Sequence, residues 1–411
     1  MIGYNYLDIK IPEERVRMNE ILNRSINEMA QTEFDCECGR HHVFDVHDLA
    51  IGPGVIQKLP EFCEPFRDGV LEVVYDQNTY RVAGKEAVRL LKDAGFQYKE
   101  LAFDSGDDIL IPDESVVGRV LEEQDKNVSL MVAIGGGSIN DSVKYVSSRT
   151  KVPYIIVGTT PSMDGYLADG APLINNGRKF SYYADLAYGA ICDTDIMKDA
   201  PMDLIMAGFG DVVGKITAIP DWDLSVKEVN EYRCDTSVEL VRRAMNKCFT
   251  SSSKLKDRDP DAIMDLIEAL MMTGVAMAWV RLSRPASGAE HMLSHYWEMD
   301  FIARGLNPNH HGTQVGVATP VIAEIYEELA DILPEETKAL CPSRLEIEKL
   351  LRDAGHPVSP KDIGISRELF YRSLMEGCTV RPRYSILMFA KEHGRLEQVA
   401  KKITNRIYGE E

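Results

Sequence analysis

The stretch SLMVAIGGGSIND (residues 129–141) joins a run of apolar residues to three consecutive glycines. The apolar run predicts a buried strand, and the segment directly after the glycines, INDSVKYVSSRT (residues 139–150), predicts a helix. Glycines in such a turn let the backbone approach a phosphate group, and the free N–H groups at the helix start stabilise its charge. The turn lacks the G-x-G-x-x-G spacing of the dinucleotide fingerprint, so a tight strand-to-helix turn is the alternative interpretation.

Strands and helices alternate on both sides of this turn in the first half of the chain. The alternation predicts a parallel sheet with helices on both faces, which is the α/β class. From about Met202 onward, strand signals nearly vanish and the pattern is helical. The expected strands are 69–79, 98–105, 129–138, 152–160 and 189–195, and the expected helices are 81–95, 112–124, 139–150, 259–283, 311–333, 344–355 and 395–409.

We therefore predict two domains. A nucleotide-binding α/β domain spans residues 1–200, and a helical domain spans residues 201–411. A chain of 411 residues is too long for one compact core, which supports this division. Small-molecule sites commonly lie in the cleft between such domains, so we expect the active site there.

The composition excludes several classes of protein. A net charge of −19 argues against binding to nucleic acid or to an anionic membrane surface, although a local basic pocket can still hold an anionic substrate. The first residues, MIGYNYLDIKIPEERVRMNE, lack the basic and apolar regions of a signal peptide. No run of about 18 apolar residues is evident that would span a membrane. We expect a cytoplasmic protein.

Asp76 follows the apolar part of the expected strand LEVVYDQNT and is a candidate cofactor ligand. A carboxylate at a strand end of a dinucleotide-binding fold commonly accepts hydrogen bonds from the adenosine ribose. Such a group favours NAD over NADP because it repels the 2′-phosphate, although Arg81 and Lys85 lie close in sequence and soften this preference. The alternative interpretation is an aspartate that forms a turn.

Four of the nine histidines lie within SGAEHMLSHYWEMDFIARGLNPNHHGTQVG (residues 287–316). His291 and His295 are four residues apart, which places them on one helix face, and His311 begins the next expected helix. A catalytic metal needs about three protein ligands and an open position. Asp211, at an expected helix start in the otherwise apolar MAGFGDVVGKITA, is the candidate carboxylate ligand, because a lone buried Asp is costly without a cation. The alternative is a set of surface histidines and an aspartate that caps a helix.

A second group of possible zinc ligands lies in FDCECGRHH, which contains Cys36, Cys38, His41 and His42. Its C-x-C spacing is tighter than that of most structural zinc sites, and no second pair follows at finger spacing. The sequence leaves its role open between a zinc site and a polar surface turn. The remaining cysteines are expected to be free thiols, as in most cytosolic proteins.

Motifs spread over most of the chain match one known family. They are GGGSIND, TTPSMDGY, GFGDVVGKITAIPDWDLS, SRPASGAEHMLSHYWEM and HHGTQVG. Together they resemble the sn-glycerol-1-phosphate dehydrogenase family, which belongs to a superfamily with iron-containing alcohol dehydrogenases, glycerol dehydrogenases and dehydroquinate synthases. The resemblance covers roughly residues 35–400.

The resemblance implies NAD(H) or NADP(H) on the first domain and one divalent metal ion between the domains. Asp211, His291 and His311 match the metal ligands of the family. His295 matches a second histidine near the substrate, and Asp164 matches an aspartate near the substrate hydroxyls. The implied cofactor-binding residues are Gly135, Gly136, Gly137, Ser138 and Asp141 of the glycine turn, Thr159 and Thr160 near the nicotinamide, and Asp76.

The implied reaction is the reversible reduction of dihydroxyacetone phosphate to sn-glycerol-1-phosphate, with the metal as Lewis acid and the nicotinamide as hydride donor. His295, or a water held by Asp164, is a candidate for proton transfer. Zinc, nickel and iron all suit an Asp/His₂ ligand set, so the ligands do not identify the metal. A phosphorylated triose needs local cations, and an arginine fork suits phosphate. The candidates are Arg284, Arg381 and Arg383.

Three alternatives to this function stay open. The first is a glycerol or polyol dehydrogenase that acts on an unphosphorylated substrate. The second is a sugar-phosphate cyclase like dehydroquinate synthase, which uses NAD without net turnover, and the third is a non-catalytic nucleotide-binding protein. The sequence also leaves the exact substrate and the preference for NADH or NADPH open. The resemblance implies a homodimer or larger assembly.

Overall fold

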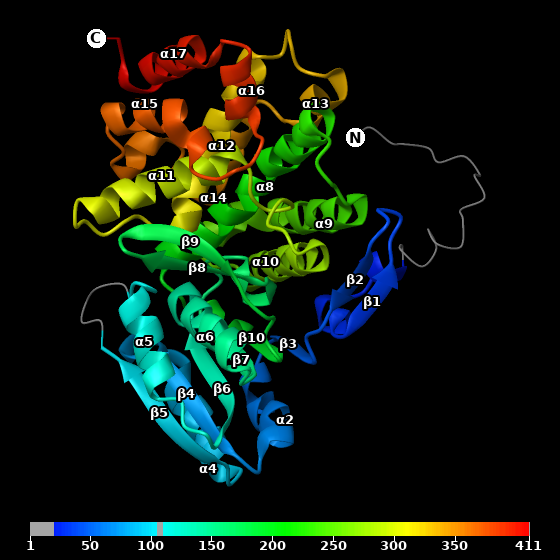
Figure 1. Cartoon of the computed structure of the whole chain (residues 1–411), viewed down its shortest axis with the longest axis vertical. Coiled ribbons are helices and arrows are strands. Elements are labelled where there is room, and N and C mark those ends of the chain that lie inside the picture. The colour runs from blue at the N-terminus through cyan, green and yellow to red at the C-terminus, as the bar shows by residue number, and fades with distance from the viewer. Residues whose placement is uncertain (1–19, 105–109, 411) are drawn as a thin grey trace.

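The computed structural model describes residues 20–104 and 110–410. In Figure 1 a half that contains the main sheet and a helical half lie at opposite ends of the molecule, with the hairpin of β8 (Gly170–Asn175) and β9 (Arg178–Tyr183) between them. This arrangement confirms the predicted fold class. Two expectations concern residues that the structure does not describe. The expectation that a signal peptide is lacking rests almost wholly on residues 1–19. The strand expected at 98–105 has its last residue at position 105. Both positions lie outside the described residues.

A six-stranded parallel sheet forms the centre of the N-terminal half. The strand order is β3–β10–β7–β6–β4–β5. The inner strands β6 and β7 are buried on both faces, which explains why the run before the glycine turn is apolar without alternation. The strands are β3 (Asp48–Gly52), β4 (Val70–Asp76), β5 (Gln97–Phe103), β6 (Val128–Gly135), β7 (Tyr154–Gly158) and β10 (Gly189–Asp193).

The direction of the strand order reverses between β4 and β6. The chain passes from β4 outward to β5, returns to β6, and then continues through β7 and β10 on the other side. Ligands of open α/β sheets bind at such a switch point, outside the carboxyl ends of the strands. Here those ends are Asp76 and Gly135. The helical segments of this half are α2 (Leu59–Cys63), α3 (Gln77–Thr79), the π-helix η4 (Tyr80–Gly84), α4 (Lys85–Asp93), α5 (Glu114–Glu122), α6 (Gly137–Thr150) and α7 (Thr194–Met197).

After β10 the described chain is helical, as predicted. The long helix α8 corrects one detail, because Asp211 lies inside it rather than at a helix start. Every residue from Ile205 to Ser225 is buried, so this helix lacks the amphipathic period by which helices are recognised. The helices are α8 (Met202–Val229), α9 (Asp235–Ser251), α10 (Pro260–Val280), α11 (Ala289–Ala303), α12 (His311–Glu328), α13 (Glu335–Leu340), α14 (Arg344–Ala354), α15 (Arg367–Glu376), α16 (Ile386–Glu392) and α17 (Leu396–Tyr408).

Two antiparallel hairpins and the edge strand β3 are absent from the sequence-based prediction. One hairpin pairs β1 (Thr32–Asp35) with β2 (His41–Phe44), and the other pairs β8 with β9. The strands of both hairpins are short, and β9 is largely exposed, so none of them carries a strong apolar signal. The β1–β2 hairpin packs against α10 (Figure 1).

One helix, α10, is long and apolar enough to cross a membrane by length and composition. The expectation that no such run exists is therefore corrected. In the structure 78% of its apolar window is buried inside the protein, as for a core helix. Most of its apolar residues belong to the largest hydrophobic cluster, which also includes residues of the sheet and of α8.

Helices α8 and α12 pack with their backbones in contact. A Cβ atom at Gly312 of α12 would overlap the carbonyl oxygen of Ala207 in α8. Gly208 of α8 faces the carbonyl oxygen of Pro161, in the loop after β7, in the same way. Only glycine permits both approaches. They bring α8, α12 and the loop that carries Asp164 to one place.

We predict that Gly312→Ala lowers the free energy of unfolding by about 1–3 kcal/mol or more, because the added methyl group forces the two helices apart. Thermal unfolding measures this effect. Gly118→Ala in α5 is the matched control, since nothing lies within 4 Å of a Cβ there. It should be neutral or stabilise the protein by up to about 1 kcal/mol. Equal losses in both variants would contradict the packing argument.

Glu72 is a fully buried carboxylate in β4. The amide of Gln124 donates to it, and the Nζ of Lys99 lies 3.8 Å from its Oε1. Burial raises the pKa of Glu72 from 4.5 to about 7, although Lys99 lowers it in part. The folded chain therefore holds a proton that the unfolded chain releases near pH 4.5. Stability from this group is fully present below about pH 4.5 and is lost as the pH rises towards 7.

We predict that Glu72→Gln stabilises the protein above pH 7 by on the order of 1–3 kcal/mol, because the neutral amide avoids burying a charge. At about pH 4 the gain should vanish, since the wild-type carboxyl is then protonated in both states. Melting curves at the two pH values measure the difference. The exposed Glu122→Gln serves as a control and should change neither curve. An equal gain at both pH values would refute the assignment.

Candidate active site

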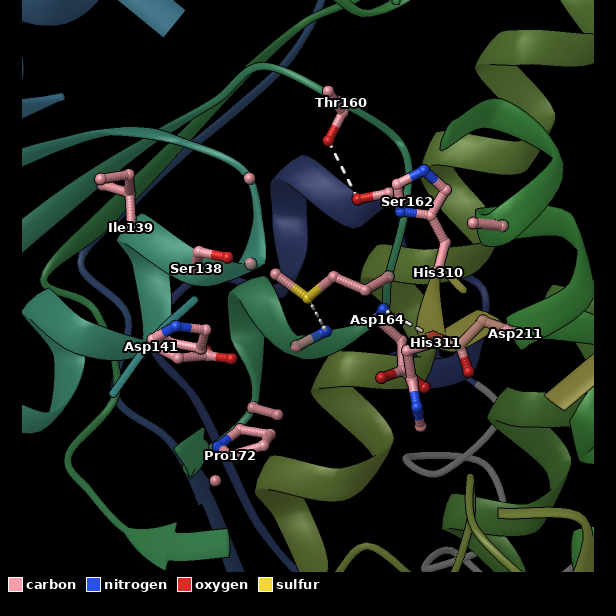
Figure 2. Close-up of a pocket in the computed structure, with 18 of the residues that line it drawn as sticks. Ser138, Ile139, Asp141, Thr160, Ser162, Asp164, Pro172, Asp211, His310 and His311 are labelled. Carbon is pink, nitrogen blue, oxygen red and sulfur yellow. Dashed lines mark hydrogen bonds between the residues drawn. The ribbon is translucent and has the colours of Figure 1, made fainter. Parts of the chain in front are cut away.

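A cavity of about 1280 Å³ lies between the two halves. It exceeds the ~300–1,000 Å³ of typical small-molecule pockets, so it has room for a dinucleotide and a second small molecule. The loops after β4, β6 and β7 line one side, and α8, α11, α12 and the β8–β9 hairpin line the other. Figure 2 shows Ser138 and Asp141 on one side of this cavity and Asp164, Asp211 and His311 on the other.

Asp211, His291 and His311 converge in the helical wall of the cavity. Each offers one ligand atom, and the three atoms lie within 4.8 Å of one another. The Nε2 of His291 is 3.6 Å from the Oδ1 of Asp211, and the ring centroids of His291 and His311 are 5.2 Å apart. The three residues come from α8, α11 and the first position of α12. The structure therefore brings together the three predicted metal ligands.

Each of the two imidazoles has a polar contact on its other ring nitrogen. The Nδ1 of His291 lies 2.8 Å from the Oε1 of Glu290, and the hydroxyl of Thr217 donates to the same carboxylate at 2.7 Å. The Nδ1 of His311 lies 3.3 Å from the hydroxyl of Ser294. Metal-binding histidines usually have such partners, which fix the ring orientation and leave the other nitrogen for the ion.

A buried ammonium group connects Asp211 to the sheet half. The Nζ of Lys215 is 2.6 Å from the Oδ1 of Asp211 and 2.7 Å from the Oδ2 of Asp164. The backbone N–H of Asp164 also donates to the Oδ2 of Asp211 at 3.1 Å. Because Lys215 is completely buried, its charge must be compensated by these carboxylates. Burial and the neighbouring Asp211 raise the pKa of Asp164, and Lys215 offsets part of this effect.

The protonation states suit a metal. Burial lowers the pKa of His311 well below its ordinary value, and the neighbouring Lys179 lowers it further. Burial also lowers the pKa of His295, and Arg381 and Lys179 lower it further, so both rings are neutral. Burial alone would raise the pKa of Asp211, but Lys215 and the histidines outweigh it and keep this carboxylate ionised. Neutral imidazole and ionised carboxylate are the forms that bind metals.

The donor set fits a divalent transition-metal ion. Two imidazole nitrogens and one carboxylate oxygen suit zinc, nickel and iron alike. Three protein ligands leave a coordination position for a substrate oxygen, which distinguishes a catalytic site from a closed structural one. His295 and Asp164 line the cavity beside these ligands.

The glycine turn after β6 opens onto the same cavity. Helix α6 begins at Gly137 with Gly136 as its N-cap, and no side chain caps its first N–H groups. A Cβ at Gly136 would lie 3.2 Å from the Oγ1 of Thr160, so the turn is narrow at this point. An uncapped helix start beside a glycine turn fits a pyrophosphate group. Gly136, Gly137 and Ser138 line the cavity, whereas Gly135 is absent from its lining, at the end of β6.

The other predicted cofactor residues also face this cavity. Asp76 accepts hydrogen bonds from the N–H groups of Asn78 and Thr79, both at 2.8 Å, so it caps α3 while it lines the cavity. Its capping role and a contact with ribose are therefore compatible. Asp141 is buried and lies 3.5 Å from the Nζ of Lys144. Thr159 and Thr160 line the cavity at the end of β7.

Two arginines give the cavity a positive region. Arg381 donates to the hydroxyl of Ser181 at 3.1 Å, and Arg383 donates to the hydroxyl of Ser283 at 2.6 Å. Neither arginine has an ion pair with another residue in the described parts of the chain. Burial lowers the pKa of Arg381 to about 10, and burial together with Arg381 lowers that of Arg383 to about 9. Nearby carboxylates, Glu298 for Arg381 and Glu231 and Glu290 for Arg383, offset this lowering only in part. A bound anion would give both guanidinium groups a direct partner.

Arg284 is placed differently from the prediction. Its guanidinium is buried, donates to the Oε1 of Glu231 at 2.7 Å and donates to the carbonyl of Tyr384 at 2.9 Å. It does not belong to the cavity lining. This placement argues against a direct phosphate contact, because the carboxylate of Glu231 already neutralises the guanidinium.

Comparison with known proteins identifies the family. A family model described as iron-containing alcohol dehydrogenase matches residues 50–201. A glycerol-1-phosphate dehydrogenase (NAD(P)+) of Halalkalibacterium halodurans is 30% identical, covering 90% of this chain and 99% of its own length. That of Bacillus licheniformis is 32% identical, covering 91% of this chain and 96% of its own. The chain belongs to the glycerol-1-phosphate dehydrogenase family.

Several solved structures have the same fold as this chain. An iron-containing alcohol dehydrogenase from Thermococcus thioreducens has a TM-score of 0.67 at 17% identity, covering 87% of this chain and 98% of its own. A probable glycerol dehydrogenase from Sinorhizobium meliloti has a TM-score of 0.65 at 16% identity, covering 87% of this chain and 96% of its own. These likenesses concern the fold alone, while the sequence relatives confirm the resemblance drawn from the motifs.

Sequence analysis did not predict two lysines of the candidate active site. Lys215 lies four residues after Asp211 in GFGDVVGK, so helical spacing alone would have placed it on the same face. Lys179 lies on β9, in the hairpin that the sequence did not reveal, and its Nζ is 2.7 Å from the Oε2 of Glu298. His310, which the motifs left without a role, also lines the cavity.

We predict that His311→Ala lowers the metal content of the purified protein by about one ion per chain, because only two ligands remain. Metal analysis by mass spectrometry after gel filtration measures this loss. His310→Ala is the matched control, since the Nε2 of His310 lies 3.1 Å from Asp203 and outside the triad. A His311→Ala protein with unchanged metal content would contradict the ligand assignment.

Proposed function

We propose that the chain catalyses the NAD(P)H-linked interconversion of dihydroxyacetone phosphate and sn-glycerol-1-phosphate. The observation that carries this proposal is the joint lining of one cavity. The cavity contains an uncapped glycine turn, a triad of candidate metal ligands and two arginines that form no ion pair in the described chain. These features suit a dinucleotide, a carbonyl or hydroxyl oxygen, and a phosphate. The names of the sequence relatives support the same activity.

The chemistry divides between bound groups and protein residues. When bound, the nicotinamide supplies hydride to C2 and a divalent ion supplies Lewis acidity towards the C2 oxygen. Asp211, His291 and His311 would hold the ion. The glycine turn would hold the pyrophosphate, and Thr159 and Thr160 would contact the nicotinamide end of the cofactor.

His295 is the proposed proton-transfer residue. It lines the cavity, and its ring centroid lies 5.2 Å from that of His311 and 6.3 Å from that of His291. Burial keeps its ring neutral, and the two nitrogens of a neutral imidazole can accept and donate a proton. Asp164, held in place by Lys215, orients a substrate hydroxyl.

Arg381 and Arg383 are the proposed phosphate ligands. Their donors meet only neutral serine and backbone oxygens within the described chain, so a phosphate replaces no existing ion pair. Lys179 adds positive charge, partly offset by Glu298. Asp76 accepts from the adenosine ribose, while Arg81, which lines the same cavity, leaves room for NADP(H) as well as NAD(H).

We further propose a cytoplasmic homo-oligomer, a dimer or larger, that binds neither nucleic acid nor membrane. The net charge of −19 supports the absence of nucleic-acid and lipid partners. All eight cysteines are free, as expected in a reducing compartment. The oligomer follows from the family resemblance.

A comparison of substrates tests the function. The metal-loaded protein is assayed for oxidation of NADH and of NADPH with dihydroxyacetone phosphate and with dihydroxyacetone. We expect kcat/KM to be about 10²-fold or more higher for the phosphorylated ketone, because two charge-assisted hydrogen bonds contribute about 1.5–3 kcal/mol each. Equal use of both ketones would indicate a polyol dehydrogenase. Absence of net NADH or NADPH oxidation with either ketone would contradict the proposal and favour the cyclase, which uses NAD without net turnover.

We predict that Arg383→Ala raises the KM for dihydroxyacetone phosphate about 10–100-fold, because the phosphate loses one charge-assisted contact. Steady-state kinetics with both ketones measures the change, and the preference for the phosphorylated ketone should fall by a similar factor. Arg395→Ala is the matched control. Its guanidinium pairs with Asp331 at 3.1 Å on the surface, so its removal should leave KM unchanged. Retention of the full preference by Arg383→Ala would refute the phosphate role.

A further inference from the structure

A second cluster of metal-ligating side chains lies outside the cavity, where the β1–β2 hairpin meets α9 and α10 (Figure 1). Three members come from the hairpin region, and the fourth is the N-cap of α9, 192 residues after His42. Each offers one ligand atom, and all four atoms lie within 4.8 Å of one another. We call this set the Cys₃His cluster: Cys36, Cys38, His42 and Cys234.

The distances inside the cluster match the edges of a metal tetrahedron. With metal–sulfur bonds of about 2.3 Å and metal–nitrogen bonds of about 2.0 Å, ligand atoms lie roughly 3.5–3.8 Å apart. The sulfurs of Cys36 and Cys234 are 3.7 Å apart. The Nε2 of His42 lies 3.2 Å from the sulfur of Cys38 and 3.3 Å from that of Cys234. The two nitrogen–sulfur distances are slightly shorter than this range, and all four ligand atoms lie close enough together to share one ion.

The orientation of His42 leaves a lone pair for an ion. Its Nδ1 is 2.6 Å from the carbonyl oxygen of Trp279, in a buried environment. A carbonyl can only accept, so Nδ1 carries the proton and Nε2 of the neutral ring presents a lone pair to the sulfurs. A histidine whose other nitrogen donates to a carbonyl is the usual arrangement of a metal ligand.

The neighbouring His41 is not part of the cluster, which shows that the cluster is not merely a histidine-rich surface. It is the next residue on β2, so its side chain points to the opposite face. It is exposed, and its Nδ1 lies 2.9 Å from the Oδ1 of Asp35. Of the two adjacent histidines that the sequence offered as zinc ligands, only His42 belongs to the cluster. The fourth member is Cys234, which no sequence spacing suggested.

We propose that the Cys₃His cluster binds one structural zinc ion that fastens the β1–β2 hairpin to α9 and α10. Three thiolates and one imidazole form a closed tetrahedral set, which is typical of structural zinc. The triad of the cavity has three ligands and an open position, so the two sites serve different purposes. An isolated two-stranded hairpin is only marginally stable, so a zinc ion would stabilise the β1–β2 hairpin in its position. This inference does not depend on the proposed reaction.

Metal analysis in a background without the cavity ion tests the proposal. In the full-length Asp211→Ala protein, purified without chelators, we expect about one zinc ion per chain. Adding His42→Ala should remove it, whereas adding the matched His41→Ala should not. Cys234→Ser should also lose the ion, and Cys248→Ser, a buried cysteine on the same helix, should retain it. Absence of zinc from the Asp211→Ala protein would overturn the proposal.

Cobalt substitution tests the ligands without altering them. Cobalt(II) loaded into the full-length wild-type protein should give a sulfur-to-metal charge-transfer band in the near ultraviolet, which the ligand triad of the cavity cannot produce because it contains no thiolate. The band should disappear when a mercurial reagent modifies the thiols, with release of the metal. Cobalt binding without this band would overturn the proposal, and this test does not depend on whether the variants fold.

Discussion

The buried ammonium of Lys215 is the interaction on which the active-site geometry depends. It lies between Asp164, from the loop after the sheet strand β7, and Asp211, from helix α8. Removal of a buried charge from such a group leaves its partners uncompensated, which costs several kcal/mol. The ion group therefore fixes the sheet half relative to the helical half at the point where a cofactor and a substrate must meet. A metal ion adds positive charge to the same carboxylates.

Helix α8 lies close to both the loop after β7 and helix α12 because its backbone is in direct contact with each of them. Gly208 admits the loop after β7, and Gly312 of α12 admits α8 itself. The close contact with α12 places Asp211 beside His311, while α11 brings His291 from a third direction. The ligand triad is thus a consequence of helix packing. The same packing buries every residue of α8 from Ile205 to Ser225, so this part of the helix shows no amphipathic period.

Charge is distributed unevenly over an acidic molecule. The chain carries a net charge of −19, yet Arg381 and Arg383 face the cavity without a carboxylate partner. Their burial removes the solvent that would otherwise stabilise them, which makes an anion a favourable partner. The Cys₃His cluster and the ligand triad differ in the number of protein ligands and in their access to the cavity. The first is closed by four protein ligands at a junction between elements, and the second leaves a position open to the cavity.

The sequence alone predicted the order of strands and helices in most of the N-terminal half, the glycine turn, and the three residues of the triad that the fold brings together. Periodicity, turn residues and local spacing are short-range properties, so they can be recognised without the fold. Asp211 was recognised because it interrupts an apolar segment. The tertiary structure alone decided that Arg284 pairs with Glu231 rather than facing the cavity. It also decided that Cys234 joins His42 across 192 residues, because long-range convergence leaves no local periodic signal.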